Sequence, residues 1–320
     1  MALWYNGPRE LEFPANPGKR TNVGVRNEGR GNVSEQGVLP MAGNEFNWRT
    51  GDGLELYGRE WPVAAEPRAV VALVHGLGEH CGRYGHVARA LNDAGYALMA
   101  FDLRGHGRSA GPRGHTPSLA ALMDDIELLL QQAGERFPGR PCFLYGHSLG
   151  GLLVLNYALR RRPALAGAIV TGPALRTPME GQGFKVTLAR LMSRLLPGLT
   201  MASGLPVEAL SRDPAVVQAY VSDPLVHDRA TARLAVELFS AARWALEHAD
   251  EFPPVPLLIM HGGADRICLP EGSCDFAARV PGECTLKVWE GLYHEVHNEP
   301  EQHEVLRFMI EWLNGHTGRE

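Results

Sequence analysis

Six short apolar runs, each ending in a glycine-rich or polar turn, constrain the fold of this chain more than any other feature. Apolar runs without polar alternation are typical of strands that are buried on both faces of a mainly parallel sheet. Helical patterns lie between the runs, and this alternation predicts an α/β fold with a doubly wound, mostly parallel sheet. The runs are AVVALVHG, YALMAFD, PCFLYG, AGAIVTG, VPLLIMHG and TLKVWEG, and the helical patterns are GHVARALNDAG, SLAALMDDIELLLQQAGERF, GGLLVLNYALRR and PEQHEVLRFMIEWLN.

Three segments fall outside this alternation. Residues 1–44 are rich in Gly, Asn, Arg and Pro and have no helical or strand period, so we expect a disordered N-terminal tail. Residues 47–61 alternate polar and apolar side chains on both sides of a Gly-Asp-Gly turn, which predicts a β-hairpin. Residues 176–250 form a long excursion between two late strands, which predicts a helical cap inserted into a core of residues 45–175 and 251–320.

Composition excludes several classes of protein. The net charge is −5 and no basic block occurs, so nucleic acid is not expected as a partner. The five cysteines include no C-x-x-C pair, which argues against a disulfide framework or a structural zinc site and favours a reducing compartment. The chain has no apolar run long enough to span a membrane and no secretory signal pattern, so we expect a cytoplasmic protein.

The pattern G-x-S-x-G, typical of a nucleophilic serine on a strained strand-to-helix turn, occurs twice. Ser148 directly follows the run PCFLY and precedes a helical pattern, which is the context that the motif requires. Ser109 follows the loop residues RGHG and precedes GPRG, where no helix can begin cleanly. We therefore predict that Ser148 is the nucleophile and that Ser109 is a loop residue.

A serine hydroxyl needs a base within hydrogen-bonding reach, and the base needs an acid to orient it. On a doubly wound sheet these groups are expected just past the carboxyl ends of later strands. Asp265 follows the run LLIM in HGGAD, and His294 follows TLKVWEG in GLYHEVH, so we predict Asp265 as the acid and His294 as the base. His297 is a rival base, but it is expected to lie on the following turn.

No metal or cofactor is predicted. The segment HEVH differs from the zinc motif H-E-x-x-H, and no third ligand is evident. The oxyanion of an acyl-transfer intermediate instead needs fixed N–H donors. We expect one from Leu149, the residue after the nucleophile, and one from Leu77, in the HGLG loop that follows an early strand.

These motifs together resemble those of the α/β-hydrolase superfamily, and within it the monoacylglycerol lipase and lysophospholipase group, also described as serine aminopeptidase-like. The resemblance covers about residues 48–313, and it includes the loop around Ser109, which identifies GRSAG as a family loop that happens to match the pattern. It implies that Ser148, Asp265 and His294 form a triad and that the substrate is an acyl-ester lipid. The motifs are VHGLGEHCGRY, FDLRGHGRSAG, YGHSLGG, SDPLV, HGGADRIC and EGLYHEVHNEP.

The resemblance also implies a substrate tunnel. Cys268 matches a position at which such lipases can carry a thiol beside the tunnel, although a small buried apolar role explains it equally well. In the helical pattern FKVTLARLMSRLLPGL, an apolar stripe includes Leu188 and Leu191. This stripe could pack on the core, or it could form a lid that lines an acyl tunnel and touches a lipid surface, giving peripheral membrane or micelle contact.

The expected activity is that of a serine carboxylic-ester hydrolase, which cleaves monoacylglycerol to glycerol and fatty acid through an acyl-enzyme. A lysophospholipase, a general carboxylesterase or an aminopeptidase could use the same residues, because a fold does not choose the leaving group. A non-catalytic binding protein is the remaining alternative, and a complete set of Ser148, Asp265 and His294 argues against it. The oligomeric state is left open by the sequence.

Overall fold

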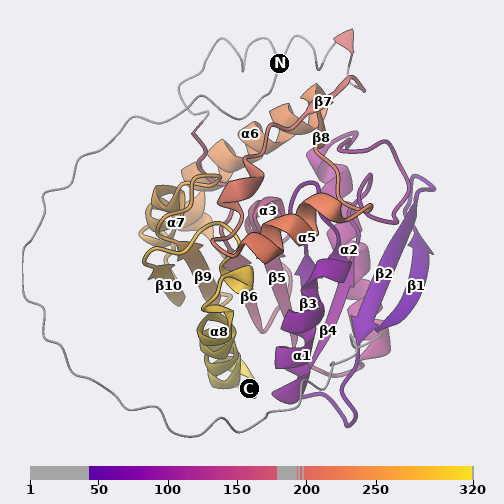
Figure 1. Ribbon diagram of the computed structural model, residues 1–320. Helices are drawn as coiled ribbons and strands as arrows, with labels where there is room; N and C mark the ends of the chain where they lie inside the picture. Colours follow the sequence, from indigo (N-terminus) through magenta and orange to yellow (C-terminus); the bar gives the residue numbers. More distant parts are fainter. Residues whose placement is uncertain (1–42, 179–192, 194, 197, 319–320) are drawn as a thin grey trace, which may run out of the picture.

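A central sheet of eight strands organises the computed structural model, which describes residues 43–178, 193, 195, 196 and 198–318. The strands lie in the order β1-β2-β4-β3-β5-β6-β9-β10 (Figure 1). β2 runs antiparallel to both of its neighbours, and all other pairs are parallel. The strands are β1 (Asn44–Arg49), β2 (Glu55–Trp61), β3 (Ala69–Val74), β4 (Tyr96–Phe101), β5 (Cys142–His147), β6 (Gly167–Thr171), β9 (Leu257–Gly262) and β10 (Cys284–Trp289).

Helices cover both faces of this sheet. Alternate side chains of β3 enter different apolar clusters: Val70 and Ala72 pack with residues of α2, α3, α6 and α7, whereas Val71 and Leu73 pack with residues of α1 and α8. All six residues of β3 are therefore buried, which explains its unbroken apolar run. The predicted doubly wound fold is confirmed. The helices of the two layers are α1 (Gly85–Asp93), α2 (Leu119–Arg136), α3 (Leu149–Arg161), α6 (Ala232–Glu247), α7 (Pro270–Ala277) and α8 (Gln302–His316).

The predicted hairpin forms one edge of the sheet. β1 and β2 pair antiparallel, from Asn44 opposite Glu60 to Arg49 opposite Glu55. Gly53 in the turn has φ +83°, a left-handed conformation that favours glycine. Asn44, which the sequence assigned to the tail, is instead the first residue of β1 because it pairs with Glu60. Residues 1–42 of the predicted tail lie outside the described residues.

The excursion between β6 and β9 contains several elements. β7 (Thr200–Ala202) and β8 (Arg229–Thr231) pair antiparallel as a separate small sheet, with η2 (Val207–Ala209) and α5 (Pro214–Ser222) between them. α6 buries Leu234 and Ala241 in the same apolar cluster as α3, so it packs as part of the helical layer of the sheet. The division of the chain into core and cap stays a prediction. Leu188 and Leu191 lie outside the described residues.

Within the described ranges, no helix combines the length and the apolar character that crossing a bilayer requires. The longest, α2, has 18 residues and carries charged side chains throughout its middle and end.

Candidate active site

Ser148 lies on a sharp turn between β5 and α3. β5 ends at His147 and α3 begins at Leu149, so a single residue joins strand and helix. Ser148 has φ +54° and ψ −114°, a conformation that L-residues rarely adopt. The turn is fixed on both sides, because the Ser148 N–H donates to the Thr171 carbonyl at 2.9 Å and the Ser148 carbonyl accepts from Leu152 N at 3.0 Å.

The two glycines that flank Ser148 permit a close approach of backbone segments. A Cβ at Gly150 would lie 2.0 Å from the Val74 carbonyl oxygen, and one at Gly146 would lie 2.3 Å from the Gly150 carbonyl oxygen. Neither contact is possible for a residue with a side chain. The glycines of GHSLG are therefore required for α3 to start directly against β3 and β5, and this packing holds the serine turn in place.

The structure brings the three residues of the predicted triad together at the carboxyl ends of the strands. Ser148 Oγ lies 2.8 Å from His294 Nε2, and His294 Nδ1 lies 2.7 Å from Asp265 Oδ2. Gly172, just past β6, has φ +49°, and a Cβ there would lie 3.2 Å from His294 Nδ1. The close approach of the imidazole ring therefore favours glycine at this position. Hydroxyl, imidazole and carboxylate form one continuous hydrogen-bonded chain.

Asp265 is a buried carboxylate with several donors. Oδ1 accepts from the N–H groups of Ile267 at 2.8 Å and Cys268 at 3.0 Å. Burial by itself would raise the pKa of Asp265, but the charge of His294 and the hydrogen bonds from His261 and His294 outweigh it and lower the pKa below its usual value. Asp265 is therefore ionised at neutral pH and can hold the imidazole by a charge-assisted bond.

The same interaction shifts the pKa of His294 in the opposite direction. Burial by itself would lower the pKa of His294, but the Asp265 charge and the hydrogen bond to Asp265 outweigh it, so the pKa lies above its usual value. A raised pKa means that the imidazolium is stabilised. His294 is therefore suited to accept a proton from Ser148.

His261, at the carboxyl end of β9, was given no role by the sequence. Its Nε2 lies 3.1 Å from Asp265 Oδ2 and 2.9 Å from the Cys268 carbonyl oxygen. Both of these oxygens accept, so Nε2 carries the proton, and Nδ1 accepts from the Ser273 hydroxyl at 2.7 Å. His261 thus orients the acid as the acid orients His294. Its place in HGGAD, four residues before Asp265, was the signal available.

His297, the rival base, lies elsewhere in the site. It belongs to η4 (Val296–Asn298) and stacks on Tyr84 with ring centroids 5.1 Å apart. Its ring also packs edge to face with the ring of His147, with the ring centroids 4.7 Å apart. Burial lowers the pKa of His297 well below its usual value, with a further contribution from His147, so the ring is neutral. The geometry places His294, and not His297, between the serine and the carboxylate.

The two predicted oxyanion donors belong to segments that lie next to Ser148. Leu149 is the first residue of α3, and Leu77 is in the loop after β3. This loop approaches the serine closely, since a Cβ at Gly76 would lie 3.3 Å from Ser148 Cβ. Within the described part of the chain, neither the Leu77 nor the Leu149 amide donates a hydrogen bond. Both N–H groups therefore lack a partner among the described residues, and their role as oxyanion donors stays a prediction.

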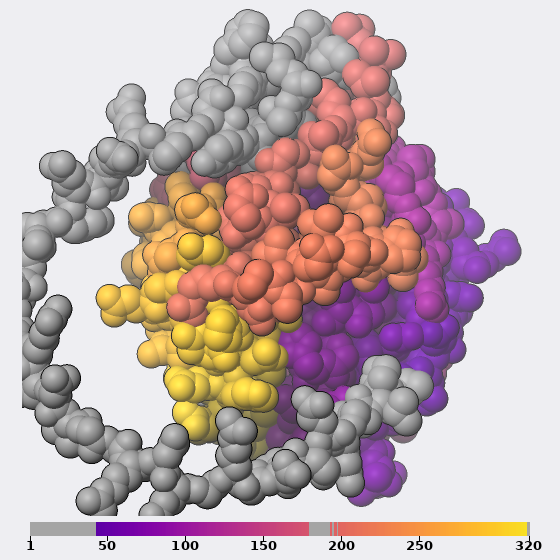
Figure 2. All heavy atoms as spheres, in the orientation of Figure 1, coloured from indigo at the N-terminus to yellow at the C-terminus, as the bar shows by residue number. Residues whose placement is uncertain are grey.

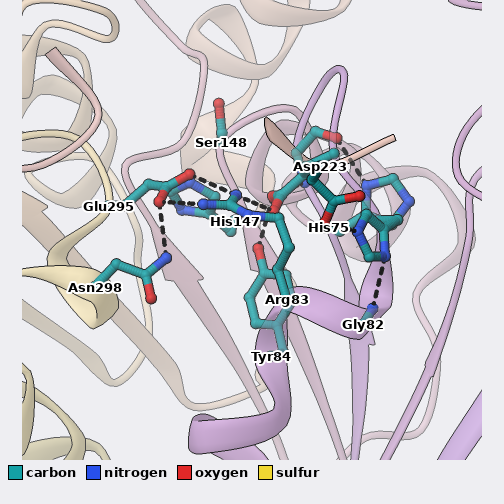
Figure 3. A network of polar contacts seen from close by, with 12 residues as sticks. His75, Gly82, Arg83, Tyr84, His147, Ser148, Asp223, Glu295 and Asn298 are labelled. Atoms are coloured by element: carbon teal, nitrogen blue, oxygen red, sulfur yellow. Dashed lines mark hydrogen bonds and ion pairs between the residues drawn. The ribbon is translucent and has the colours of Figure 1, made fainter. Parts of the chain in front are cut away.

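A buried ionic network joins the loop after β3 to the loop of His294 (Figure 3). Arg83 lies 2.6 Å from Glu79 Oε2, and it binds both oxygens of Glu295 at 2.7 Å. Asn298 Nδ2 donates to Glu295 at 2.7 Å, and the Tyr84 hydroxyl donates to Glu79 at 2.8 Å. Breaking a buried ionic set of this kind typically costs about 3–5 kcal/mol.

The two carboxylates of this network differ in pKa. Burial disfavours charge on both. At Glu295 the charge of Arg83 and hydrogen bonds from Arg83 and Asn298 outweigh burial and lower the pKa, whereas at Glu79 burial, with the Glu295 charge, outweighs Arg83 and raises it. The sequence shows Glu79 and Arg83 four residues apart in HGLGEHCGRY, but it gives no local signal for the pairing with Glu295.

Cys268 lies in the turn after Asp265, with 2% of its surface exposed. Burial, together with the Asp265 charge, raises the pKa of its thiol well above the usual value, although the neighbouring Ser148 hydroxyl acts in the opposite direction. The thiol is therefore protonated and close to the nucleophile. Its place in an acyl tunnel, together with Leu188 and Leu191, stays a prediction.

The HEVH segment, considered above as a zinc motif, contributes His294 to the chain of hydrogen bonds with Ser148 and Asp265. A metal site needs several ligands that converge on one point. Over the described ranges, no group of three or more His, Cys, Asp or Glu side chains is arranged to hold a metal ion.

Comparison with known proteins places the chain in a family. The family model of serine aminopeptidase, S33 matches residues 65–301. A monoacylglycerol lipase of Mycolicibacterium smegmatis is 38% identical over 266 residues, which are 82% of this chain and 94% of that protein. An uncharacterised abhydrolase domain-containing protein of Dictyostelium discoideum is also 38% identical, over 276 residues, and the match spans 85% of this chain but 29% of that longer protein.

A solved structure extends this result to three dimensions. The crystal structure of Paleococcus ferrophilus monoacylglycerol lipase superposes with a TM-score of 0.75 at 39% sequence identity, covering 82% of this chain and 99% of that one. The site described above lies within the matched region of the family model. The chain therefore belongs to the serine aminopeptidase S33 family, in the monoacylglycerol-lipase-like group of the α/β-hydrolases.

Proposed function

We propose that this protein is a serine carboxylic-ester hydrolase that cleaves monoacylglycerol to glycerol and a fatty acid through an acyl-enzyme. The observation that carries the proposal is the continuous chain from Ser148 Oγ through the His294 imidazole to Asp265, with separations of 2.8 and 2.7 Å. The names of the M. smegmatis and P. ferrophilus relatives support monoacylglycerol as the substrate.

In the first half of the reaction, His294 Nε2 takes the Ser148 proton as the hydroxyl oxygen attacks the ester carbonyl carbon. Asp265 keeps the other imidazole nitrogen protonated and stabilises the imidazolium. The N–H groups of Leu149 and Leu77, which lack a partner among the described residues, would hold the oxyanion. The tetrahedral intermediate then collapses, His294 protonates the departing glycerol oxygen, and the acyl group stays on Ser148.

In the second half, water replaces the alcohol. His294 takes a proton from the water as its oxygen attacks the acyl carbonyl, and the second tetrahedral intermediate expels the Ser148 oxygen. The proton returns to Ser148, and the fatty acid leaves. Each step uses the same imidazole as base and then as acid, which the raised pKa of His294 allows.

A panel of substrates tests this activity. Monoacylglycerol, lysophosphatidylcholine and aminoacyl anilides are supplied side by side to the wild type, with the Ser148→Ala variant as the blank. We expect monoacylglycerol to give the highest kcat/KM. Preference for lysophosphatidylcholine would assign the protein as a lysophospholipase, and preference for the anilide as an aminopeptidase.

Labelling by a fluorophosphonate probe separates an enzyme from a binding protein on this fold. Such probes react with an activated serine, so we expect one label per wild-type chain and none on the Ser148→Ala variant. A wild type that is folded but unlabelled would contradict the proposal.

We further propose that the excursion of residues 176–250 acts as a cap that meets lipid surfaces. Support comes from three exposed leucines near its start, Leu195, Leu196 and Leu199, whose exposed fractions are 66%, 53% and 41%. Large apolar side chains gathered on a surface are typical of membrane or partner contact. Such peripheral contact fits the cytoplasmic location that the composition predicts.

Sedimentation with phosphatidylcholine vesicles tests this contact. We expect Leu195→Asp/Leu196→Asp to weaken vesicle binding while leaving the hydrolysis of a soluble short-chain ester unchanged. Leu286→Asp is the control, because Leu286 is an exposed apolar residue on the edge strand β10 and does not belong to residues 176–250. Equal binding by all three proteins would contradict the proposed contact.

A further inference from the structure

Residues 206–213, which we name the strap, run alongside the loop that carries His294. The Leu210 carbonyl accepts from Glu295 N at 2.8 Å, and the Ala209 carbonyl accepts from His294 N at 3.4 Å. The backbone of the base itself and of the next residue is therefore hydrogen-bonded to a segment that precedes it by more than eighty positions.

A buried carboxylate reinforces this contact. The side chain of Glu299 is 0% exposed; its Oε1 accepts from Tyr293 N at 2.8 Å and from Arg212 N at 3.2 Å, and its Oε2 accepts from Arg212 Nε at 2.8 Å. Tyr293 is the residue before His294. A buried carboxylate is tolerated only with charged and hydrogen-bonding partners, and here the strap supplies the charge. Glu299 thus connects the strap to the peptide that precedes the base.

The strap also contacts the turn of the acid. Ala209 and Leu210 pack in one apolar cluster with Ile267 and Cys268, whose N–H groups bind the Asp265 carboxylate. One short segment therefore touches both the loop of the base and the turn of the acid. A shift of the strap would change the separation of these two groups.

α5 carries the strap across to the loop that follows β3. Beyond its C-terminal end, Asp223 Oδ2 lies 2.9 Å from His80 Nε2, and His227 N donates to the Gly78 carbonyl at 2.9 Å. Figure 2 shows this orange segment on the surface between the yellow C-terminal region and the purple N-terminal region. The strap and α5 therefore bridge the loop of His294 and the loop of Leu77.

We propose that Arg212 and Glu299 are positioning residues, whose ion pair, buried on the Glu299 side, fixes the strap against the loop of His294 and so holds the imidazole between Asp265 and Ser148. This inference rests on the proposed ester hydrolysis. Since a misplacement of about 1 Å can reduce the rate of an enzyme by about 10²-fold, loosening the pair is expected to slow the chemical step.

The test compares Arg212→Ala and Glu299→Gln with a matched control. Glu301 also pairs with Arg212, but its side chain is 40% exposed, so Glu301→Gln removes a partner of the same arginine at the surface. With a short-chain nitrophenyl ester, we expect the first two variants to lower kcat by about 10- to 100-fold at similar KM. We expect the control to stay within about twofold of the wild type, because exposed ion pairs contribute little.

The pH profile separates positioning from a loss of stability. The charge of Asp265 raises the pKa of His294, so an imidazole that moves away from it becomes more acidic. We therefore expect the acid limb of kcat/KM to shift to lower pH in both variants and not in the control. The other titratable groups that interact with His294 are His147, His297, Glu295 and Glu79, and they are the same in every protein compared.

Three results would overturn the inference. They are a kcat of Arg212→Ala within about twofold of the wild type, a lower kcat with an unshifted acid limb, or a raised KM at constant kcat, which would indicate substrate binding instead. If either variant does not fold, Arg212→Lys decides in its place, because a lysine keeps a positive charge beside the buried carboxylate but cannot reproduce the bond from Arg212 Nε to Glu299. An inactive wild type would refute the proposed hydrolysis itself, whereas an active wild type with an unaffected Arg212→Ala variant would refute only the positioning role.

Discussion

Ser109 and Ser148 occupy the same G-x-S-x-G pattern, but their hydroxyl groups have different uses. Ser109 Oγ accepts from Tyr57 N at 2.9 Å and donates to the Asp102 carbonyl at 2.5 Å, so it ties the loop after β4 to β2. Ser148 Oγ instead faces His294 Nε2 at 2.8 Å. The Ser109 hydroxyl is hydrogen-bonded to two backbone groups, whereas the Ser148 hydroxyl is placed to transfer its proton to His294.

The glycines of the two motifs also serve different needs. Gly107 has φ +48°, and a Cβ there would lie 2.1 Å from Asp102 Oδ2, so this glycine lets a loop wrap around a carboxylate. A Cβ at Gly150 would lie 2.0 Å from the Val74 carbonyl, so that glycine lets a helix start against a strand. The pattern alone therefore indicates only a close approach of backbone. The strand before it and the helix after it decide whether the serine can be a nucleophile.

The strongest test of this comparison is Ser148→Ala. Removing the nucleophile of such a triad reduces kcat by about 10⁶-fold, and we expect a loss of that order on a nitrophenyl ester. The measurement is the steady-state rate, corrected for spontaneous hydrolysis. A folded variant that retains more than about a hundredth of the wild-type rate would assign the chemistry to another residue.

The next test compares the acids of the two regions, Asp265 and Asp102. Asp265→Asn removes the charge that holds His294 and puts an amide donor in place of an oxygen that accepts, so we expect kcat to fall by about 10⁴-fold. Asp102 accepts from Cys81 N at 2.8 Å and from Arg108 N at 2.7 Å, contacts that organise the loop around Ser109.

Asp102→Asn is therefore the matched control for the acid. Asparagine has only one accepting oxygen, so one of the two backbone N–H groups bound by Asp102 loses its acceptor. This costs about 1–3 kcal/mol of folding free energy, and we expect kcat to stay within about tenfold of the wild type. Equal losses of kcat in the two variants, at temperatures where both are folded, would contradict the assignment of Asp265.

A smaller effect is expected from pH. His294 accepts a proton only when neutral, so activity falls as the pH drops through its pKa. Because this pKa is raised, the acid limb of kcat/KM should lie above the usual value of about 6.5 and fall about tenfold per pH unit below it. By contrast, burial, with contributions from His75 and His227, lowers the pKa of His106, the residue just before the first motif, well below its usual value, so that ring does not titrate in this range. An acid limb below about pH 6.5 would contradict the effect of Asp265.

The sequence predicts those parts of the site that follow directly from strand ends. Ser148, Asp265 and His294 each come just after an apolar run, and a parallel sheet brings the carboxyl ends of its strands to one edge. This rule needs no knowledge of distant contacts, which is why three residues spread over 147 positions are found together. The same runs predict the sheet, because burial on both faces demands unbroken apolar strands.

Other parts of the site depend on contacts that leave no periodic pattern. Arg83 pairs with Glu295 across 212 positions, and Arg212 pairs with Glu299 across 87. His261 can donate to the Asp265 carboxylate only because the turn after β9 brings Asp265 next to the end of the strand. Charged residues of these kinds are usually exposed, so a sequence pattern assigns them to the surface.

The smallest effect on activity is expected for Ser109→Ala. Removal of the hydroxyl leaves Tyr57 N and the Asp102 carbonyl without their partner in a region where Ser109 is 5% exposed, so we expect a loss of about 1–3 kcal/mol in the free energy of unfolding. The kcat should remain within about twofold, because this hydroxyl makes its bonds to β2 and to the end of β4.

Urea unfolding, with kcat measured well below the transition, checks both halves of this expectation. Ser222→Ala is the control, because its exposed hydroxyl bonds only carbonyl groups of its own helix, and we expect a change within about 0.5 kcal/mol. A folded Ser109→Ala variant with a large loss of kcat would show that the first motif takes part in the chemistry. Both hydroxyls, that of Ser109 and that of Ser148, would then be needed for turnover.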